Sequence, residues 1–253
     1  GSGGGDYSDA DTLYDSLTAA GFQTNPDLKA FYENDGLSGP GRSDNPDIEN
    51  AGVSSLDTGE TPVSAYDDDL KGTFSSYGDA ALVLFTRISG EGWDLPASEY
   101  VDDDGRLVAR HYLALDRNER DLLDMVCDAG FDHVIVLINS ANAMELGWLD
   151  QEEYGIDACL WVGGVGQSGA RAIAGALAGT VNPSGRLVDT YAADSLSAPA
   201  MQNMGKMYYT NTDEEITRTG GVLGFTPGAY TIEAEGIYVG YRYHETRYYD
   251  YVA

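Results

Sequence analysis

Residues 80–94 read AALVLFTRISGEGWD, and the predicted fold depends on this stretch. The unbroken apolar run from Ala80 to Phe85 is typical of a strand that is buried on both faces. Two glycines with Glu91 between them follow that run closely. In open α/β sheets ligands bind beyond the carboxyl ends of the strands, so a loop at this place can present Glu91 to a substrate. Glu91 is therefore our first candidate for a catalytic residue.

Apolar runs and helical patterns alternate along the rest of the chain. The sequence predicts further strands at 133–138, 158–162 and 186–191, and helices at about 13–20, 26–32, 116–130, 144–149 and 168–178. Asp116, with Glu119 three residues later, has the spacing of a capping box at the start of the third of these helices. Such alternation predicts an α/β fold with a mainly parallel sheet and helices on both faces, an α/β sandwich. Right-handed crossovers place the loops after the strands on one edge of the sheet. We expect Glu91, residues 139–142 and residues 163–169 to gather there.

The domain organisation follows from the composition of the remaining segments. We expect residues 1–253 to form a single α/β-sandwich domain, with a long irregular insertion at 34–79 that is rich in Gly, Pro, Ser and Asp. Residues 193–253 read as a loop-rich C-terminal extension, in which 237–243 alternate like an edge strand. The opening GSGGG is typical of a segment of a longer protein.

The charge of the chain excludes some classes of partner. The formal net charge is −28, and a surface this acidic repels nucleic acid and anionic membranes, so we expect neither as a partner. No stretch approaches the roughly 18 apolar residues of a membrane-spanning helix. The three histidines lack metal-type spacing, and we expect neither a metal nor another cofactor. The sequence leaves the oligomeric state and the location open, with the cytoplasm favoured over secretion or the cell surface.

A glycine motif at 164–169 suggests a different function. It reads GVGQSG, follows a predicted strand, precedes a predicted helix, and has Asp189 twenty residues beyond Gly169. This pattern matches the fingerprint of dinucleotide-binding domains, whose helix terminus binds a pyrophosphate. However, the fingerprint normally lies in the first βαβ unit, and here it lies late in the chain. The alternative is a tight strand-to-helix turn with close helix packing, and both interpretations stay open from the residues alone.

The residues around Glu91 also have two interpretations. A glutamate between glycines is most often a solvated surface charge, whereas Trp93 beside it suits the packing of a sugar ring on an indole face. Trp93 fits equally well as a cover over the core. Arg87 and Asp94 are candidate substrate-binding residues, or they pair with each other and hold the loop.

Several segments, taken together and in order, resemble the α/β-sandwich second domain of glycoside hydrolase family 3, the β-glucosidase and β-xylosidase family. They are GSGGG at 1–5, RISGEGWD at 87–94, VLINS at 136–140, GQSG at 166–169, NPSGRL at 182–187 and EGIYVGYRY at 235–243. The resemblance covers nearly the whole chain. Residues 139–142 and 188–191 are similar to permuted members, which carry the sandwich before the barrel. A serine at 168 replaces the family's more usual glutamate.

The resemblance implies a retaining β-glycosidase that hydrolyses terminal β-D-glucosyl or related residues. By this resemblance, Glu91 is the general acid/base. This domain also contributes one wall of the aglycone site. The nucleophile would be an aspartate on a barrel domain that this sequence does not contain, so the barrel and a carbohydrate are the implied partners. A first sandwich strand before Gly1 and a fibronectin-like domain after Ala253 are also implied. A non-catalytic carbohydrate-binding or scaffold domain is the alternative, and a dinucleotide-binding domain is the second one.

Overall fold

The computed structural model describes residues 8–34, 59–87, 99–102, 104–203, 207–211, 229–230 and 232–251. The chain forms two compact units, Gly1–Ala193 and Asp194–Ala253, and each is described by itself below. The second unit begins one residue after the start of the loop-rich extension that we predicted from the sequence.

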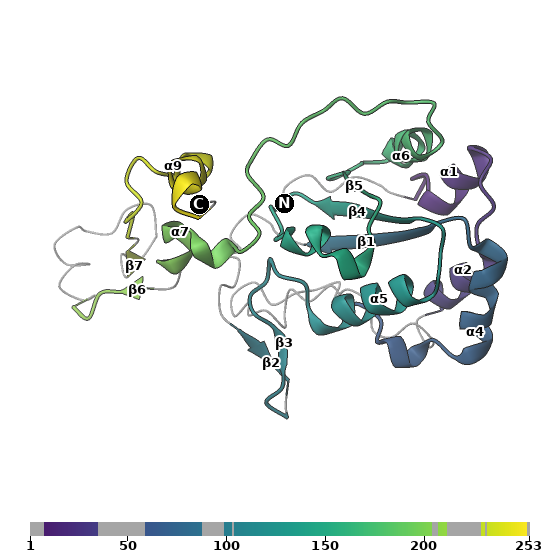
Figure 1. The fold of residues 1–253 in the computed structure, drawn as a ribbon, viewed down its shortest axis with the longest axis horizontal. Coiled ribbons are helices and arrows are strands. Elements are labelled where there is room, and N and C mark those ends of the chain that lie inside the picture. Colours follow the sequence, from purple (N-terminus) through teal and green to yellow (C-terminus); the bar gives the residue numbers. More distant parts are fainter. Residues whose placement is uncertain are drawn as a thin grey trace. The chain divides into compact units, whose positions relative to one another are not determined.

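The first unit is built around a three-stranded parallel sheet with the order β1-β4-β5 (Figure 1). The strands are β1 (Ala81–Arg87), β4 (Val134–Ser140) and β5 (Ala158–Trp161). All seven residues of β1 pair with β4, and the four of β5 pair with residues 135–138 of β4. The predicted parallel sheet is therefore confirmed, and its strands fall within two residues of the predicted ends.

The main helix of this unit, α5 (Arg117–Asp128), covers one face of the sheet. It begins with a capping box between Asp116 and Glu119, as we predicted, which satisfies two backbone N–H groups at the helix start. Its apolar residues pack with the strands in one core cluster, whose buried members include Val83, Phe85, Leu122, Leu123, Val126, Val134, Val136, Ile138, Met144 and Trp148. This core anchors the ends of β1 and β4.

Two helices, α1 (Leu13–Ala19) and α6 (Gly169–Leu177), pack together and lie on the other side of the sheet from α5 (Figure 1). Leu137 of β4 is fully buried although it alternates with the residues of the α5 core, so β4 is covered on both faces. Leu84 on β1, an edge strand, is 43% exposed. The sheet is thus covered most completely at its central strand.

The predicted insertion at 34–79 is not irregular in its second half, where the structure contains short helices. Residues 59–79 contain η2 (Val63–Ala65), α4 (Asp68–Thr73) and η3 (Phe74–Tyr77), following α2 (Pro26–Tyr32) earlier in the chain. The side chain of Asp67 caps α4 by accepting the N–H of Leu70, and Leu70 and Phe74 are buried in the core. Their spacing of four residues is helical, and polar neighbours hid this short pattern. Residues 35–58 lie outside the described residues.

The remaining connections that the structure describes in the first unit contain only short elements. β2 (Tyr100–Val101) and β3 (Leu107–Ala109) form an antiparallel pair, and the predicted helix at 144–149 is replaced by the 3₁₀ turns η4 (Gly147–Asp150) and η5 (Glu152–Tyr154). The predicted strand at 186–191 is wrong. These residues pair with no strand among those described, and Val188 is 91% exposed. Apolar composition alone does not make a strand where no neighbouring strand supplies hydrogen bonds.

The second unit contains η6 (Ser195–Ser197), α7 (Pro199–Gln202), the antiparallel pair β6 (Met207–Tyr208) and β7 (Ala229–Tyr230), and α9 (Tyr241–Tyr251). The predicted edge strand at 237–243 is wrong, because α9 begins at Tyr241. Gly236 and Gly240 have φ values of +56° and +57°, which interrupt an extended backbone despite the alternating pattern between them.

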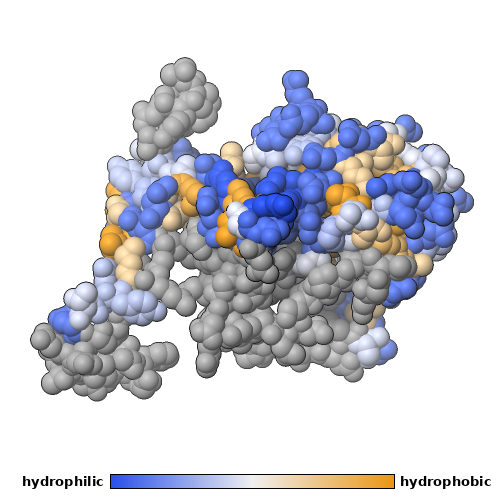
Figure 2. All heavy atoms as spheres, turned by 90° about the horizontal axis from the view of Figure 1, so that it is seen from below, coloured by the Kyte–Doolittle hydropathy of each residue, from blue (hydrophilic) through white to orange (hydrophobic). Residues whose placement is uncertain are grey.

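The surface of the described residues is mainly hydrophilic on the face drawn in Figure 2, and the hydrophobic residues there lie in small separate groups. No helix among the described residues is long and apolar enough to cross a membrane.

Candidate functional site

The three parallel strands of the first unit end at one edge of the sheet, and this edge is the candidate site. Arg87 at the end of β1 pairs in register with Ser140 at the end of β4, and Trp161 at the end of β5 pairs with Ile138. Loops that follow these strands therefore start close together. In the sequence, Glu91 follows four residues beyond Arg87, in the segment after β1.

Arg87 is buried and uses all of its guanidinium donors inside the protein. Its Nε donates to the carbonyl oxygen of Tyr112 at 2.7 Å, and one Nη donates to the carbonyl oxygen of Thr86 at 2.7 Å. The other Nη donates to the carbonyl oxygen of Ala114 at 2.7 Å. The two Nη atoms also bind the two carboxylate oxygens of Glu119, at 2.6 and 2.7 Å. A guanidinium has five N–H groups, and these contacts account for each one.

Glu119 balances the buried charge of Arg87. Its side chain is only 2% exposed, and one of its oxygens also accepts the backbone N–H of Asp116 at 2.8 Å. Burial alone would lower the pKa of Arg87, but the charge and hydrogen bonds of Glu119 outweigh burial and raise that pKa above its ordinary value. The pair is therefore a charged, bidentate contact, the strongest class of side-chain hydrogen bond.

A second buried pair lies between the segment before α5 and the loop after β4. Nε2 of His111 lies 2.7 Å from Oε1 of Glu145, and the His111 side chain is fully buried. Nδ1 of His111 accepts the backbone N–H of Leu113 at 3.1 Å, so in the neutral ring Nε2 carries the proton and donates it to Glu145. The backbone N–H of Glu145 in turn donates to the carbonyl oxygen of Leu113 at 2.9 Å.

Polar and aromatic groups line the same edge beyond β4. The indole N–H of Trp161 donates to the carbonyl oxygen of Ser140 at 2.7 Å, and the side-chain amide of Asn139 donates to the carbonyl oxygen of Gly163 at 2.5 Å. Trp161 is 38% exposed. These bonds hold the starts of the loops after β4 and β5 against each other.

The predicted site residues have different outcomes. Glu91, Trp93 and Asp94 lie outside the described residues, whereas Arg87 is described and pairs with Glu119 rather than offering free donors. The predicted gathering of 139–142 and 163–169 is supported by the contact between Asn139 and Gly163.

Sequence reasoning missed the buried groups Glu119, His111 and Glu145. Glu119 was recognised only as part of a capping box, and that signal indicates a helix start without indicating a second partner. His111 and Glu145 lie 34 residues apart and carry no recognisable spacing.

The glycine motif at 164–169 forms a strand-to-helix turn. Gly166 has a φ of +61°, and a Cβ at Gly169 would lie 2.7 Å from the Cβ of Val165. Glycine is thus needed at both places for the backbone and the close packing alone. Asp189, which the dinucleotide fingerprint would place at a strand end, is exposed and lies in no strand. The geometry favours the turn over a nucleotide site.

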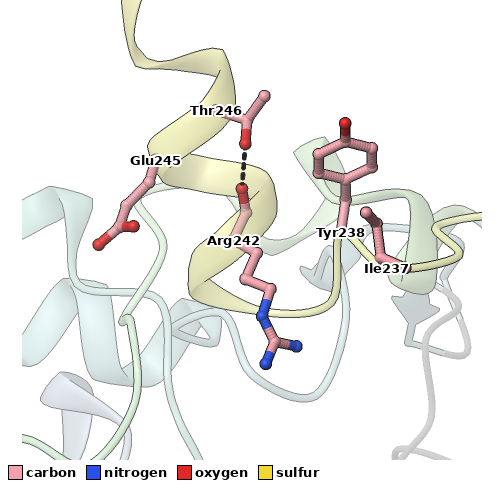
Figure 3. A pocket seen from close by; sticks show the side chains of 5 residues that line it. All are labelled: Ile237, Tyr238, Arg242, Glu245 and Thr246. Carbon is pink, nitrogen blue, oxygen red and sulfur yellow. Dashed lines mark hydrogen bonds between the residues drawn. The ribbon is translucent and has the colours of Figure 1, made fainter.

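Other parts of the described structure hold little that points to a ligand. No group of three His, Cys, Asp or Glu side chains in the described ranges is placed to hold a metal ion. In the second unit, an open pocket of about 500 Å³ is lined by Ile237, Tyr238, Arg242, Glu245 and Thr246 (Figure 3). Glu245 and Arg242 point to different sides of α9, and the lining residues are exposed.

Comparisons with known proteins identify the family. A profile of the Glycosyl hydrolase family 3 C-terminal domain matches residues 1–241. β-Glucosidase A of Butyrivibrio fibrisolvens is 29% identical over 195 residues, which are 72% of this chain and 21% of that protein. A β-glucosidase of Ruminococcus albus is 30% identical over 180 residues, which are 71% of this chain and 15% of that protein.

A solved structure agrees with these relatives. A β-glucosidase from Paenibacillus barengoltzii has a TM-score of 0.65 and 26% sequence identity, over 93% of this chain and 22% of that one. The matched part of this chain thus spans between 15% and 22% of the proteins that it is similar to. With the parallel sheet and its covering helices on both sides, these matches show that the chain belongs to glycoside hydrolase family 3, as the α/β-sandwich C-terminal domain of that family.

Proposed function

We propose that this chain is the domain of a retaining β-glycosidase that supplies the general acid/base, Glu91, and part of the aglycone site. The match of the family's C-terminal domain over residues 1–241 carries the proposal. The position of Glu91, shortly after the carboxyl end of a strand of the parallel sheet, supports it because such loops present side chains to ligands in open α/β sheets. The named relatives are β-glucosidases, so a terminal β-D-glucosyl residue is the proposed glycone.

The proposed chemistry needs two carboxyl groups with different roles. Glu91 protonates the oxygen of the leaving group while the nucleophile, an aspartate on a barrel domain outside this chain, attacks the anomeric carbon. Glu91 then removes a proton from the water that hydrolyses the glycosyl-enzyme intermediate. The two carboxyl groups of a retaining enzyme stand about 5–5.5 Å apart, so the barrel must dock beside the edge of the sheet where β1 ends.

Trp93 and Asp94 belong to the same proposal as aglycone contacts. An indole face accepts the C–H face of a sugar ring, and a carboxylate accepts hydrogen bonds from its hydroxyl groups. Arg87 enters the proposal in a different role, because its five N–H groups are already bonded within the protein.

The decisive experiment replaces Glu91 by Gln in the full-length protein that carries this domain. We expect kcat/KM to fall by about 10²–10⁴-fold for substrates with poor leaving groups, such as alkyl β-glucosides, because their departure requires protonation. For a dinitrophenyl β-glucoside, whose leaving group departs without a proton, kcat/KM should fall far less, because this constant reports the glycosylation step. Added azide should restore turnover of this substrate. Glu153→Gln, at an exposed position in η5, is the matched control and should leave kcat/KM unchanged for both substrates.

The same experiment separates the alternatives. Equal losses for both substrates, without azide rescue, would contradict an acid/base role for Glu91. If the full-length protein hydrolyses no β-glycoside but binds an oligosaccharide in calorimetry, the domain is part of a carbohydrate-binding or scaffold protein.

A further inference from the structure

Arg87 and Glu119 form a buried unit at the point where β1 passes into the segment that carries Glu91. We propose that these two side chains are positioning residues, which fix the end of β1 so that Glu91 stands in place for proton transfer. The inference rests on the proposed function of Glu91. Neither side chain touches substrate in this proposal, because both act through the backbone that they hold.

The contacts of Arg87 join separate parts of the fold. Its guanidinium binds the carbonyl oxygen of Thr86 on its own strand, the carboxylate of Glu119 on α5, and the carbonyl oxygens of Tyr112 and Ala114 in the segment before α5. A planar guanidinium holds its donors in fixed directions, so these bonds leave the last residue of β1 little freedom to move. A lysine at this position could make at most three such bonds, in no fixed plane.

The segment that receives these bonds is itself anchored to the loop after β4. His111 binds Glu145 through its ring, and the backbone N–H of Glu145 donates to the carbonyl oxygen of Leu113. Residues 111–115 therefore make hydrogen bonds both to Arg87 and to Glu145, and both of these side chains are buried. Through this segment, the last residue of β1 is linked to Glu145 in the loop after β4.

Stability alone does not explain a buried ion pair at this place. Removing two charges from water is costly, and well-packed apolar side chains of similar volume often stabilise a core as well or better. What the pair adds is a defined direction, since Arg87 and Glu119 meet in a bidentate geometry. Glu91 follows only four residues later, and a displacement of about 1 Å can lower a catalysed rate by about 10²-fold.

The test uses Glu119→Gln and Arg87→Lys in the full-length enzyme. The amide introduced by Glu119→Gln has nearly the shape of the native carboxylate, but it offers only one acceptor oxygen and turns an NH₂ group toward a guanidinium N–H. For an alkyl β-glucoside we expect kcat/KM to fall by about 10²-fold, because a displaced acid cannot protonate the leaving oxygen. For a dinitrophenyl β-glucoside we expect a loss of less than about 10-fold, because that leaving group needs no proton.

A matched control and a count of active sites separate positioning from folding. Leu122→Ala removes a buried side chain from the same helix without removing a bond to Arg87. It should therefore change kcat/KM by the same factor for both substrates. Active sites are counted by trapping the nucleophile with an activated 2-fluoro-glucoside, and all rates are divided by that count. Partial unfolding of a variant then does not hide the result.

Each outcome decides between the proposals. If Glu119→Gln and Arg87→Lys lower kcat/KM per active site by the same factor for both substrates, the positioning role is contradicted. If Glu91→Gln shows the leaving-group dependence and these two variants do not, positioning fails while the function of Glu91 stands. If Glu91→Gln shows no leaving-group dependence, the proposed function itself fails.

Discussion

Two hydrogen bonds of 2.6 and 2.7 Å join the guanidinium of Arg87 to the carboxylate of Glu119, and both side chains are buried. Arg87 is the last residue of β1, and Glu119 lies in the first turn of α5. The same carboxylate accepts the backbone N–H of Asp116 and completes the capping box of α5. One side chain thus starts the main helix and neutralises the charge at the end of the strand.

This pair should be sensitive to the loss of one partner. Glu119→Leu leaves a buried guanidinium without its counter-charge, and we expect it to lower the free energy of unfolding by about 3–5 kcal/mol. Urea unfolding, followed by circular dichroism, measures the change. Asp124→Leu, at an exposed position on the same helix, should change the free energy by no more than about 0.5 kcal/mol. Similar values for the two variants would mean that the bidentate contact contributes nothing to folding.

Glu60 gives the protein a stability that depends on pH. Burial raises the pKa of Glu60 to about 7 from its ordinary 4.5, with the carboxylates of Glu119 and Asp116 adding to the shift and the hydrogen bond from the Thr61 N–H opposing it. Between these two values the folded protein holds a proton that the unfolded chain has lost. The contribution of Glu60 is therefore fully present below pH 4.5 and is lost as the pH rises toward 7.

The variant Glu60→Gln tests this slope. Its amide stays neutral at every pH, so the decline in stability between pH 4.5 and 7 should become shallower, and the variant should gain stability over the native protein above pH 7. Unfolding midpoints in urea across this pH range measure the difference. Parallel curves for the two proteins would show that Glu60 titrates alike in the folded and unfolded states.

Gly163 should be required where it meets Trp161. Its φ is +56°, and a Cβ there would lie 2.9 Å from Cζ2 of the indole. We expect Gly163→Ala to cost about 1–2 kcal/mol for the left-handed backbone and to displace the indole, which changes its fluorescence. Gly164→Ala is the control, because a Cβ at Gly164 meets nothing within 4 Å. The emission change should disappear in a Trp161→Phe background, and its persistence there would assign it to another tryptophan.

The core of α5 should behave as a packed interior. Leu123 is fully buried, and Leu123→Ala should lower the free energy of unfolding by about 2–5 kcal/mol through lost contacts and the cavity left behind. Val188→Ala is the control, since Val188 is 91% exposed and the change should stay within about 0.5 kcal/mol. Urea unfolding compares them, and a large loss for Val188→Ala would indicate that residue 188 is covered in solution.

Patterns confined to a few neighbouring residues were predictable. The apolar runs of β1, β4 and β5 and the capping box of α5 were recognised because strand burial and helix capping depend on residues within one element. The strands predicted at 186–191 and 237–243 were wrong, because a strand also needs a neighbour to pair with and a backbone free of interrupting turns. The helix that carries Leu70 and leads to Phe74 was missed, because its helical pattern consists of only these two buried apolar residues.

The fold class and the family could be inferred from the chain as it is written, because the order of the strands and the succession of motifs are properties of the sequence. What surrounds the end of β1 became visible only in the folded protein. Arg87 meets Glu119 across 32 residues, and His111 meets Glu145 across 34. Buried charges must find partners wherever the packed elements bring them together, and that geometry arises from the whole fold rather than from any local spacing.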